Sequence, residues 1–143
     1  MNWYKISQKQ YRGRLYNKLM QLRPQFAAAA QKVYDEWDQN NEGIDDTLGS
    51  GGICQDIAEA IANVVSFSTN YNASTIEAQC GEQHVWAVVY NKTEAYHVDI
   101  HYGVYETGGG YNWKKKPDVK FDANMIEIYP ADREIIDYIE NDI

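Results

Sequence analysis

The spacing of the apolar residues changes about halfway along this chain, and that change constrains the fold more than any other feature. Up to about residue 67 the apolar side chains recur every three or four positions, as Leu15, Leu19 and Leu22 do. This spacing is typical of helices that bury one face. Beyond residue 75 the chain contains short apolar runs bounded by glycine, asparagine and charged residues, a pattern typical of strands. The sequence therefore predicts an α+β fold.

The helical half is expected to contain three helices. An amphipathic helix is predicted over about residues 8–22, and Pro24 is predicted to stand in the first turn of a second helix that ends near residue 40, because proline is tolerated in a first turn. A mostly buried helix is predicted from Ile53 to about Phe67. A loop rich in glycine separates the second helix from this third one.

The second half is expected to form an antiparallel meander followed by a strand and a C-terminal helix. The predicted strands are 75–80, 84–90, 95–100 and 125–129. The C-terminal helix begins near Asp132, and its isoleucines at 135, 136 and 139 are predicted to face inward. The length of 143 residues fits one domain, which we divide into an N-terminal helical region (1–48), a core (49–130) and the C-terminal helix (131–143).

Composition excludes several classes of protein. The apolar runs are far shorter than the roughly 20 residues of a membrane span, and the first residues lack the pattern of a secretory signal, so a cytoplasmic protein is expected. Cys54 and Cys80 are predicted to be thiols, because two cysteines do not make the dense disulfide framework of a small secreted domain. No zinc-binding spacing of cysteine or histidine pairs occurs, and we expect no cofactor.

The charge is unevenly distributed. Residues 1–34 hold seven basic side chains and no acid, although the whole chain has a formal net charge of −8. The basic N-terminal helix is predicted to dock on the acidic remainder of the chain, or simply to present a solvated face. A nucleic-acid partner is not expected, because the acidic remainder would repel a polyanion.

The residues that suggest chemistry begin with Cys54. It follows Gly51 and Gly52 at the predicted start of a helix, where free backbone N–H groups and the positive end of the helix dipole favour a thiolate. His84 opens a predicted strand, and Asp99 lies in the next strand of the same hairpin. A thiol, an imidazole that takes its proton and a carboxylate that orients the imidazole form a catalytic triad.

The segments around these residues resemble the transglutaminase-like superfamily. Gly52-Ile53-Cys54-Gln55-Asp56-Ile57-Ala58 is similar to its G-x-C-x-D-x-A segment, His84-Val85-Trp86 to its H-x-W strand, and Tyr96-His97-Val98-Asp99 to its aromatic-x-V-D strand. The order of the three segments also agrees. The resemblance covers about residues 49–101, roughly a third of the chain.

The resemblance implies a papain-like core in which a cysteine-bearing helix packs on an antiparallel sheet. It implies that Cys54 is the nucleophile, His84 the general base and Asp99 its orienter. It further implies that Trp86 shields the His–Asp pair from water and that Asp56 has a structural role near the helix start. The expected activity is that of a thiol-dependent amide hydrolase or acyltransferase acting on a peptide or protein.

Two alternatives remain open. Members of the superfamily without catalysis exist, so the resemblance also allows a binding module on the same fold. Alternation in a strand places His97, Asp99 and His101 on one face, and together with His84 they form a set of ligands suited to a transition metal. If that metal site exists, Cys54 is a core residue.

Overall fold

The computed structural model describes residues 13–41, 53–80, 82–100 and 120–141 of the chain. Among these residues lie three α-helices, a 3₁₀ turn and four strands. The helices and the turn are α1 (Arg14–Asn41), α2 (Ile53–Ser68), η2 (Ala123–Met125) and α4 (Arg133–Asn141). The strands are β1 (Asn72–Cys80), β2 (Glu82–Tyr90), β3 (Ala95–Ile100) and β4 (Ile126–Pro130). The predicted α+β class is confirmed.

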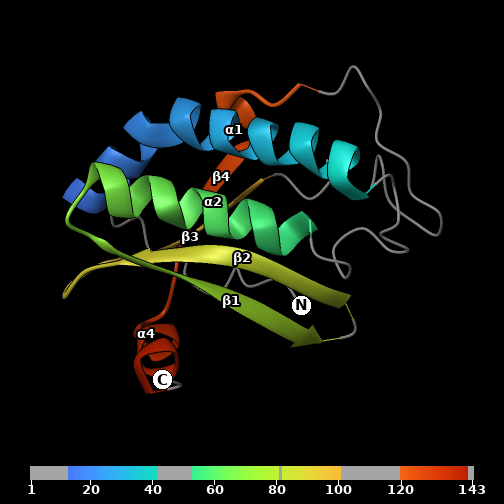
Figure 1. Cartoon of the computed structure of the whole chain (residues 1–143). Coiled ribbons are helices and arrows are strands. Elements are labelled where there is room, and N and C mark those ends of the chain that lie inside the picture. The colour runs from blue at the N-terminus through green and yellow to red at the C-terminus, as the bar shows by residue number, and fades with distance from the viewer. Residues whose placement is uncertain (1–12, 42–52, 81, 101–119, 142–143) are drawn as a thin grey trace.

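The described elements form three layers (Figure 1). The four strands make one antiparallel sheet in the order β1-β2-β3-β4, which is the predicted meander with the last strand added. Helices α1 and α2 lie on one face of this sheet, and α4 lies on the other. The larger core fills the space between α1, α2 and the sheet, and a smaller cluster forms beneath α4.

Alternation along the strands assigns side chains to these two cores. In β3, Tyr96, Val98 and Ile100 belong to the larger core, whereas Ala95 belongs to the cluster beneath α4. Strand β2 follows the same rule, with Ala87 and Val89 on one side and Trp86 and Val88 on the other. All six residues of β3 are buried, because helices cover both faces of this central strand. The prediction that Ile135 and Ile136 face inward is confirmed, since both are buried.

The prediction that Pro24 begins a second helix is wrong. Helix α1 runs without a break from Arg14 to Asn41 and contains Pro24 in its interior. Proline has no N–H to bond the carbonyl of residue 20, but Nε of Arg23 donates to the carbonyl oxygen of Met20 over 3.3 Å. A neighbouring guanidinium thus satisfies the carbonyl that the proline leaves open. The apolar residues Leu19, Leu22 and Phe26 continue across the proline into one buried stripe, which stabilises the uninterrupted helix.

The start of α1 is held by a residue from a distant loop. The carbonyl of Gly13 accepts the N–H of Asn17 over 3.1 Å, so Gly13 stands at the position where a capping side chain usually occurs. Glycine has no side chain, and Oε2 of Glu94 accepts the N–H of Leu15 over 3.3 Å instead. Oε1 of Glu94 accepts the hydroxyl of Tyr96 over 2.9 Å. The buried carboxylate therefore joins the β2–β3 loop to the N-terminus of α1.

Local structure in the β2–β3 loop presents Glu94 for this role. Oδ1 of Asn91 accepts the backbone N–H of Thr93 over 2.8 Å and that of Glu94 over 2.7 Å. The N–H of Asn91 donates to the carbonyl of Glu94 over 2.9 Å. Asparagine favours such turns because its short side chain can bond backbone groups two or three residues ahead. The turn fixes the backbone of Glu94, so that its side chain reaches α1.

We expect Gly13→Ala to lower the free energy of unfolding by about 1 to 3 kcal/mol, the usual cost of overpacking. A Cβ at residue 13 would lie 2.6 Å from Cδ and from Oε1 of Glu94, and that carboxylate is bonded to Leu15 and Tyr96. Urea unfolding followed by circular dichroism measures the change. Asn17→Ala, an exposed position in the same turn, should change stability by less than about 0.5 kcal/mol. Equal stabilities of the two variants would contradict the close contact with Glu94.

Candidate functional site

Cys54 occupies the first turn of α2, as the sequence predicts. It is the second residue of the helix, its side chain is 1% exposed, and it belongs to the larger core. It is a free thiol. The first backbone N–H groups of a helix have no partner within the helix, and the helix dipole makes this end positive. The position is therefore suited to a thiolate and to an oxyanion formed beside it.

The three residues of the predicted triad lie on α2, β2 and β3. In Figure 1, α2 begins at the right of the view, where β1 ends and β2 begins, and α2 packs on β1 and β2. Ala87 pairs with Val98, and the pairing continues in register to Tyr90 with Ala95. The same register, extended toward the strand ends, sets Trp86 opposite Asp99 and places His84 one diagonal step from Asp99. The backbone of His84 pairs with Ala78 of β1; its side chain lies outside the described part.

Asp99 and Cys54 are assigned to different sides of the sheet. Asp99 is 3% exposed and alternates with Val98 and Ile100, which belong to the larger core together with Cys54, so it lies on the side of Ala95 and His97. Its Oδ1 accepts the N–H of Ile100 over 2.8 Å. Contact between a thiol at Cys54 and an imidazole held by Asp99 therefore has to run around the end of the sheet, and does not cross a face of it.

Trp86 has a partner that the sequence did not predict. Its indole Nε1 donates to Nδ1 of His97 over 2.9 Å, and the two ring centroids lie 5.9 Å apart. Both side chains are buried. Burial lowers the pKa of His97 to about 4, against an opposing contribution from the charge of Asp132. His97 is thus a neutral imidazole near neutral pH. The only sequence signal for this pair was that Trp86 and His97 fall on the same face of the β2–β3 hairpin.

This bond bears on the alternative of a metal site at His84, His97, Asp99 and His101. Nδ1 of His97 accepts a hydrogen bond and therefore has no proton, so in the neutral ring Nε2 carries it. Neither nitrogen has a lone pair free for a metal unless the bond to Trp86 breaks. Among the described residues no group of three or more potential ligands is close enough to hold a metal ion. His101 and the side chain of His84 lie outside the described part.

The side of the sheet that carries Asp99 and His97 also carries a second polar pair, on β4. Asp99 pairs directly with Glu127, and His97 with Tyr129. The hydroxyl of Tyr129 donates to Oε2 of Glu127 over 2.7 Å. Burial, this hydrogen bond and the charge of Glu127 together raise the pKa of Tyr129 to about 12. The hydroxyl therefore remains a donor to Glu127 over the physiological pH range.

The supporting residues implied by the resemblance are only partly described. Asp56 lies in the first turn of α2, where the positive end of the helix dipole stabilises a carboxylate. Its pKa is raised, first by partial burial and then by the charge of Glu59. Gly52 lies outside the described residues, and so does the N-terminal basic segment before residue 13. Cys80 is described by its backbone alone, which ends β1 opposite Glu82.

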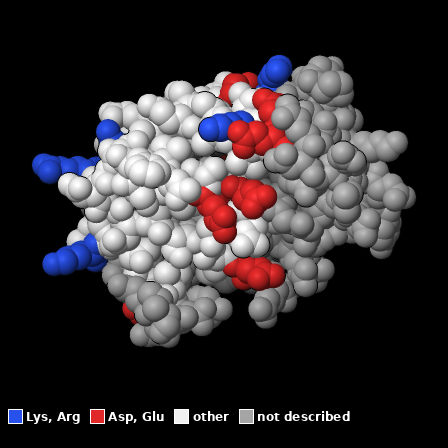
Figure 2. Space-filling model, in the orientation of Figure 1, with Lys and Arg blue, Asp and Glu red and all other residues white. Residues whose placement is uncertain are grey.

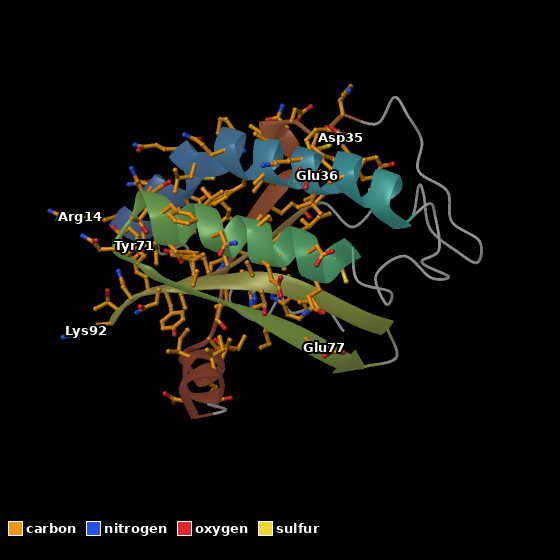
Figure 3. All side chains as sticks on the ribbon, in the orientation of Figure 1. Arg14, Asp35, Glu36, Tyr71, Glu77 and Lys92 are labelled. Carbon is orange, nitrogen blue, oxygen red and sulfur yellow. The ribbon has the colours of Figure 1, made fainter. Side chains whose placement is uncertain are left out.

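The described surface carries its charges unevenly. In the view of Figure 2, blue side chains protrude at the left edge, blue and red side chains lie side by side near the top, and red side chains alone lie over the middle. Figure 3 labels Arg14 and Lys92 at the left edge and Glu77 on β1, on the side of the candidate site. None of the helices within the described residues has the length and apolar character that a membrane crossing requires.

Comparison of the chain with protein-family models, with curated proteins and with solved structures found no match. The described residues form an α+β protein with helices on both faces of a four-stranded antiparallel sheet.

Proposed function

We propose that this protein is a thiol-dependent amide hydrolase or acyltransferase that acts on a peptide or protein, with Cys54 as nucleophile. The observation that carries the proposal is the position of Cys54 in the first turn of α2, which packs on the sheet whose strands β2 and β3 contain His84 and Asp99. The papain-like, transglutaminase-like version of the α+β fold is part of the same proposal.

In the proposed reaction, Sγ of Cys54 attacks the amide carbon while His84 takes the thiol proton. His84 then gives that proton to the leaving amine, and a thioester forms on Cys54. Water or a second amine attacks the thioester to release the acid or the transferred acyl group. Asp99 orients the imidazole, as the third member of a triad does. The N–H groups at the start of α2 stabilise the oxyanion of each tetrahedral intermediate.

A test of the nucleophile needs no substrate. Iodoacetamide should modify Cys54 in preference to Cys80 at neutral pH, with a rate that depends on pH, because the thiolate is the reacting species. Peptide mapping by mass spectrometry identifies the modified cysteine. We expect His84→Ala to slow labelling of Cys54 at least tenfold, because general-base effects amount to about 10²–10⁴, and Cys80→Ser to leave it unchanged. Slow, equal labelling of the two cysteines would contradict the proposed nucleophile.

The burial of Cys54 favours one second candidate, a binding module that does not catalyse a reaction. A thiol that is 1% exposed within an apolar core resembles an ordinary buried cysteine. On that hypothesis Cys54→Ala preserves both the fold and the binding of any partner, and Cys54 resists alkylation in the native protein while reacting in urea. The labelling experiment therefore distinguishes the two candidates.

A further inference from the structure

Strand β1 is an edge of the sheet, and within the described part of the chain only β2 pairs with it. Its nine residues pair with β2 in one continuous register from Asn72 with Tyr90 to Cys80 with Glu82. No bulge interrupts this register. A straight edge strand presents a row of backbone N–H and carbonyl groups along its outer side, and such a row pairs readily with another extended chain.

The sequence of β1 lacks the features that usually keep an edge strand unpaired. Proteins protect such edges with lysines, prolines, bulges or very short strands. Strand β1, NASTIEAQC, contains neither proline nor lysine, and Glu77 is its single charged residue. The side chains from Ala73 to Ile76 are only partly exposed. The strand is therefore suited to accept a further strand by addition to the sheet.

The edge leads to the candidate active site. Strand β1 ends at the same end of the sheet as the start of α2, so a chain that pairs along β1 arrives beside the turn that contains Cys54. Papain-like chemistry needs an extended main chain at the nucleophile, since the scissile amide must be reached by both the thiolate and the imidazole. A peptide held along β1 meets this requirement.

Charge indicates what kind of peptide would bind there. Residues 33–91 contain ten acidic side chains and no lysine or arginine. Those on the described elements next to the edge are Asp56 and Glu59 on α2 and Glu77 on β1, and all three are exposed. Figure 2 shows acidic side chains over the middle of the view, and basic ones at its left edge and near its top. Surfaces of one sign attract partners of the opposite sign and orient them during the encounter.

We infer that β1 docks an extended, basic segment of the substrate as a fifth strand of the sheet. The main chain of this segment bonds the outer edge of β1, and its lysines or arginines face Glu77, Asp56 and Glu59. The assignment of the segment to a substrate rests on the proposed function, whereas the docking itself does not need a reactive Cys54.

The test uses the full chain with Cys54→Ser, so that binding is measured without turnover. Fluorescein-labelled ten-residue peptides of alternating lysine and threonine, or of alternating glutamate and threonine, are titrated by fluorescence anisotropy at low salt. The basic peptide should bind at least tenfold more tightly than the acidic one. Glu77→Lys should weaken binding of the basic peptide about three- to tenfold, as expected for one charge reversal at an interface. The matched reversal Glu134→Lys, exposed on α4 across the sheet, should leave binding unchanged.

Two further measurements identify pairing through the backbone. N-methylation of alternate amides in the basic peptide should abolish binding for one set of positions and spare it for the other, because a strand directs alternate N–H groups to one side. Hydrogen exchange should show slower exchange of β1 amides in the complex. Binding without slower exchange in residues 72–80, or equal effects of Glu77→Lys and Glu134→Lys, would overturn the inference. A concentration-dependent dimer that protects β1, or failure of both peptides to bind, would also overturn it.

If labelling shows Cys54 to be inert while the basic peptide still binds along β1, the proposed function fails and the docking surface stands. If Cys54 is reactive and the peptide does not bind, the docking inference fails and the proposed function stands.

Discussion

Glu94→Ala should lower the free energy of unfolding by about 3 kcal/mol. The carboxylate is 6% exposed and accepts hydrogen bonds from the N–H of Leu15 and the hydroxyl of Tyr96. Its removal leaves two buried donors without this acceptor, and an unsatisfied buried donor costs about 1–3 kcal/mol. The start of α1 also loses a negative charge at the positive end of its dipole. Urea unfolding at pH 7, followed by circular dichroism, measures the loss.

Two milder variants separate these contributions. Glu94→Gln keeps the volume and one acceptor oxygen but removes the charge, so we expect it to cost about half as much as Glu94→Ala. Tyr96→Phe removes one donor, and combined with Glu94→Ala it should cost less than the sum of the single changes, because the two side chains share a bond. Strict additivity, or a Glu94→Ala variant as stable as the natural protein, would show that Glu94 does not hold α1 in solution.

The second large effect is a loss of stability in acid that depends on His97. Its pKa is about 4 in the folded protein and about 6.5 in an unfolded chain. Between these values the unfolded state binds more protons, so the free energy of unfolding decreases as the pH falls from about 6.5 to about 4. This difference in pKa between the two states lowers the free energy of unfolding by about 3 kcal/mol at the acid end of the range. This contribution of His97 to the free energy of unfolding is fully present above pH 6.5 and is lost by pH 4.

The groups around His97 explain the direction of the shift. Burial lowers the pKa of His97, and the charge of Asp132, between β4 and α4, favours the charged form without outweighing burial. Trp86 donates to Nδ1, and Tyr129 stands opposite on β4. His97→Gln keeps an acceptor for the indole and removes the titration. Carboxylates titrate in both proteins, so the difference between their stability curves from pH 4 to pH 7 isolates His97. Parallel curves would contradict the lowered pKa.

Much of the fold follows from local patterns of residues. The strands and the register of the β2–β3 hairpin agree with the prediction because the apolar runs and the loop from Asn91 to Glu94 fix them within a short stretch of chain. The inward residues of α4 follow from their spacing. The single helix through Pro24 was missed, because a preference for helix ends at proline is local, whereas the buried stripe from Leu15 to Phe26 and the bond from Arg23 to Met20 act across the break.

In the candidate site, too, the sequence predicted the local features but missed the contacts between distant segments. The sequence indicates Cys54 at a helix start and singles out His84, Trp86 and Asp99 by type and order. It assigns Trp86 to the protection of a His–Asp pair, but the indole bonds His97, a residue that the sequence suggested only as a metal ligand. The side of the sheet on which Asp99 lies was also left open by the sequence, since one residue of loop error reverses it.

Apart from the unbroken helix through Pro24, the sequence by itself determined which described segments are helices and strands, where the thiol stands in its helix and how the charges are divided along the chain, because each of these depends on neighbours a few residues apart. Only the tertiary structure decided that Glu94 caps a helix 79 residues earlier in the chain, that Trp86 bonds Nδ1 of a His97 kept neutral by burial, and that β1 is an edge of the sheet formed by the described residues. These features depend on contacts between segments distant in sequence, which the packing of α1, α2 and α4 on the sheet brings together and which no local pattern encodes.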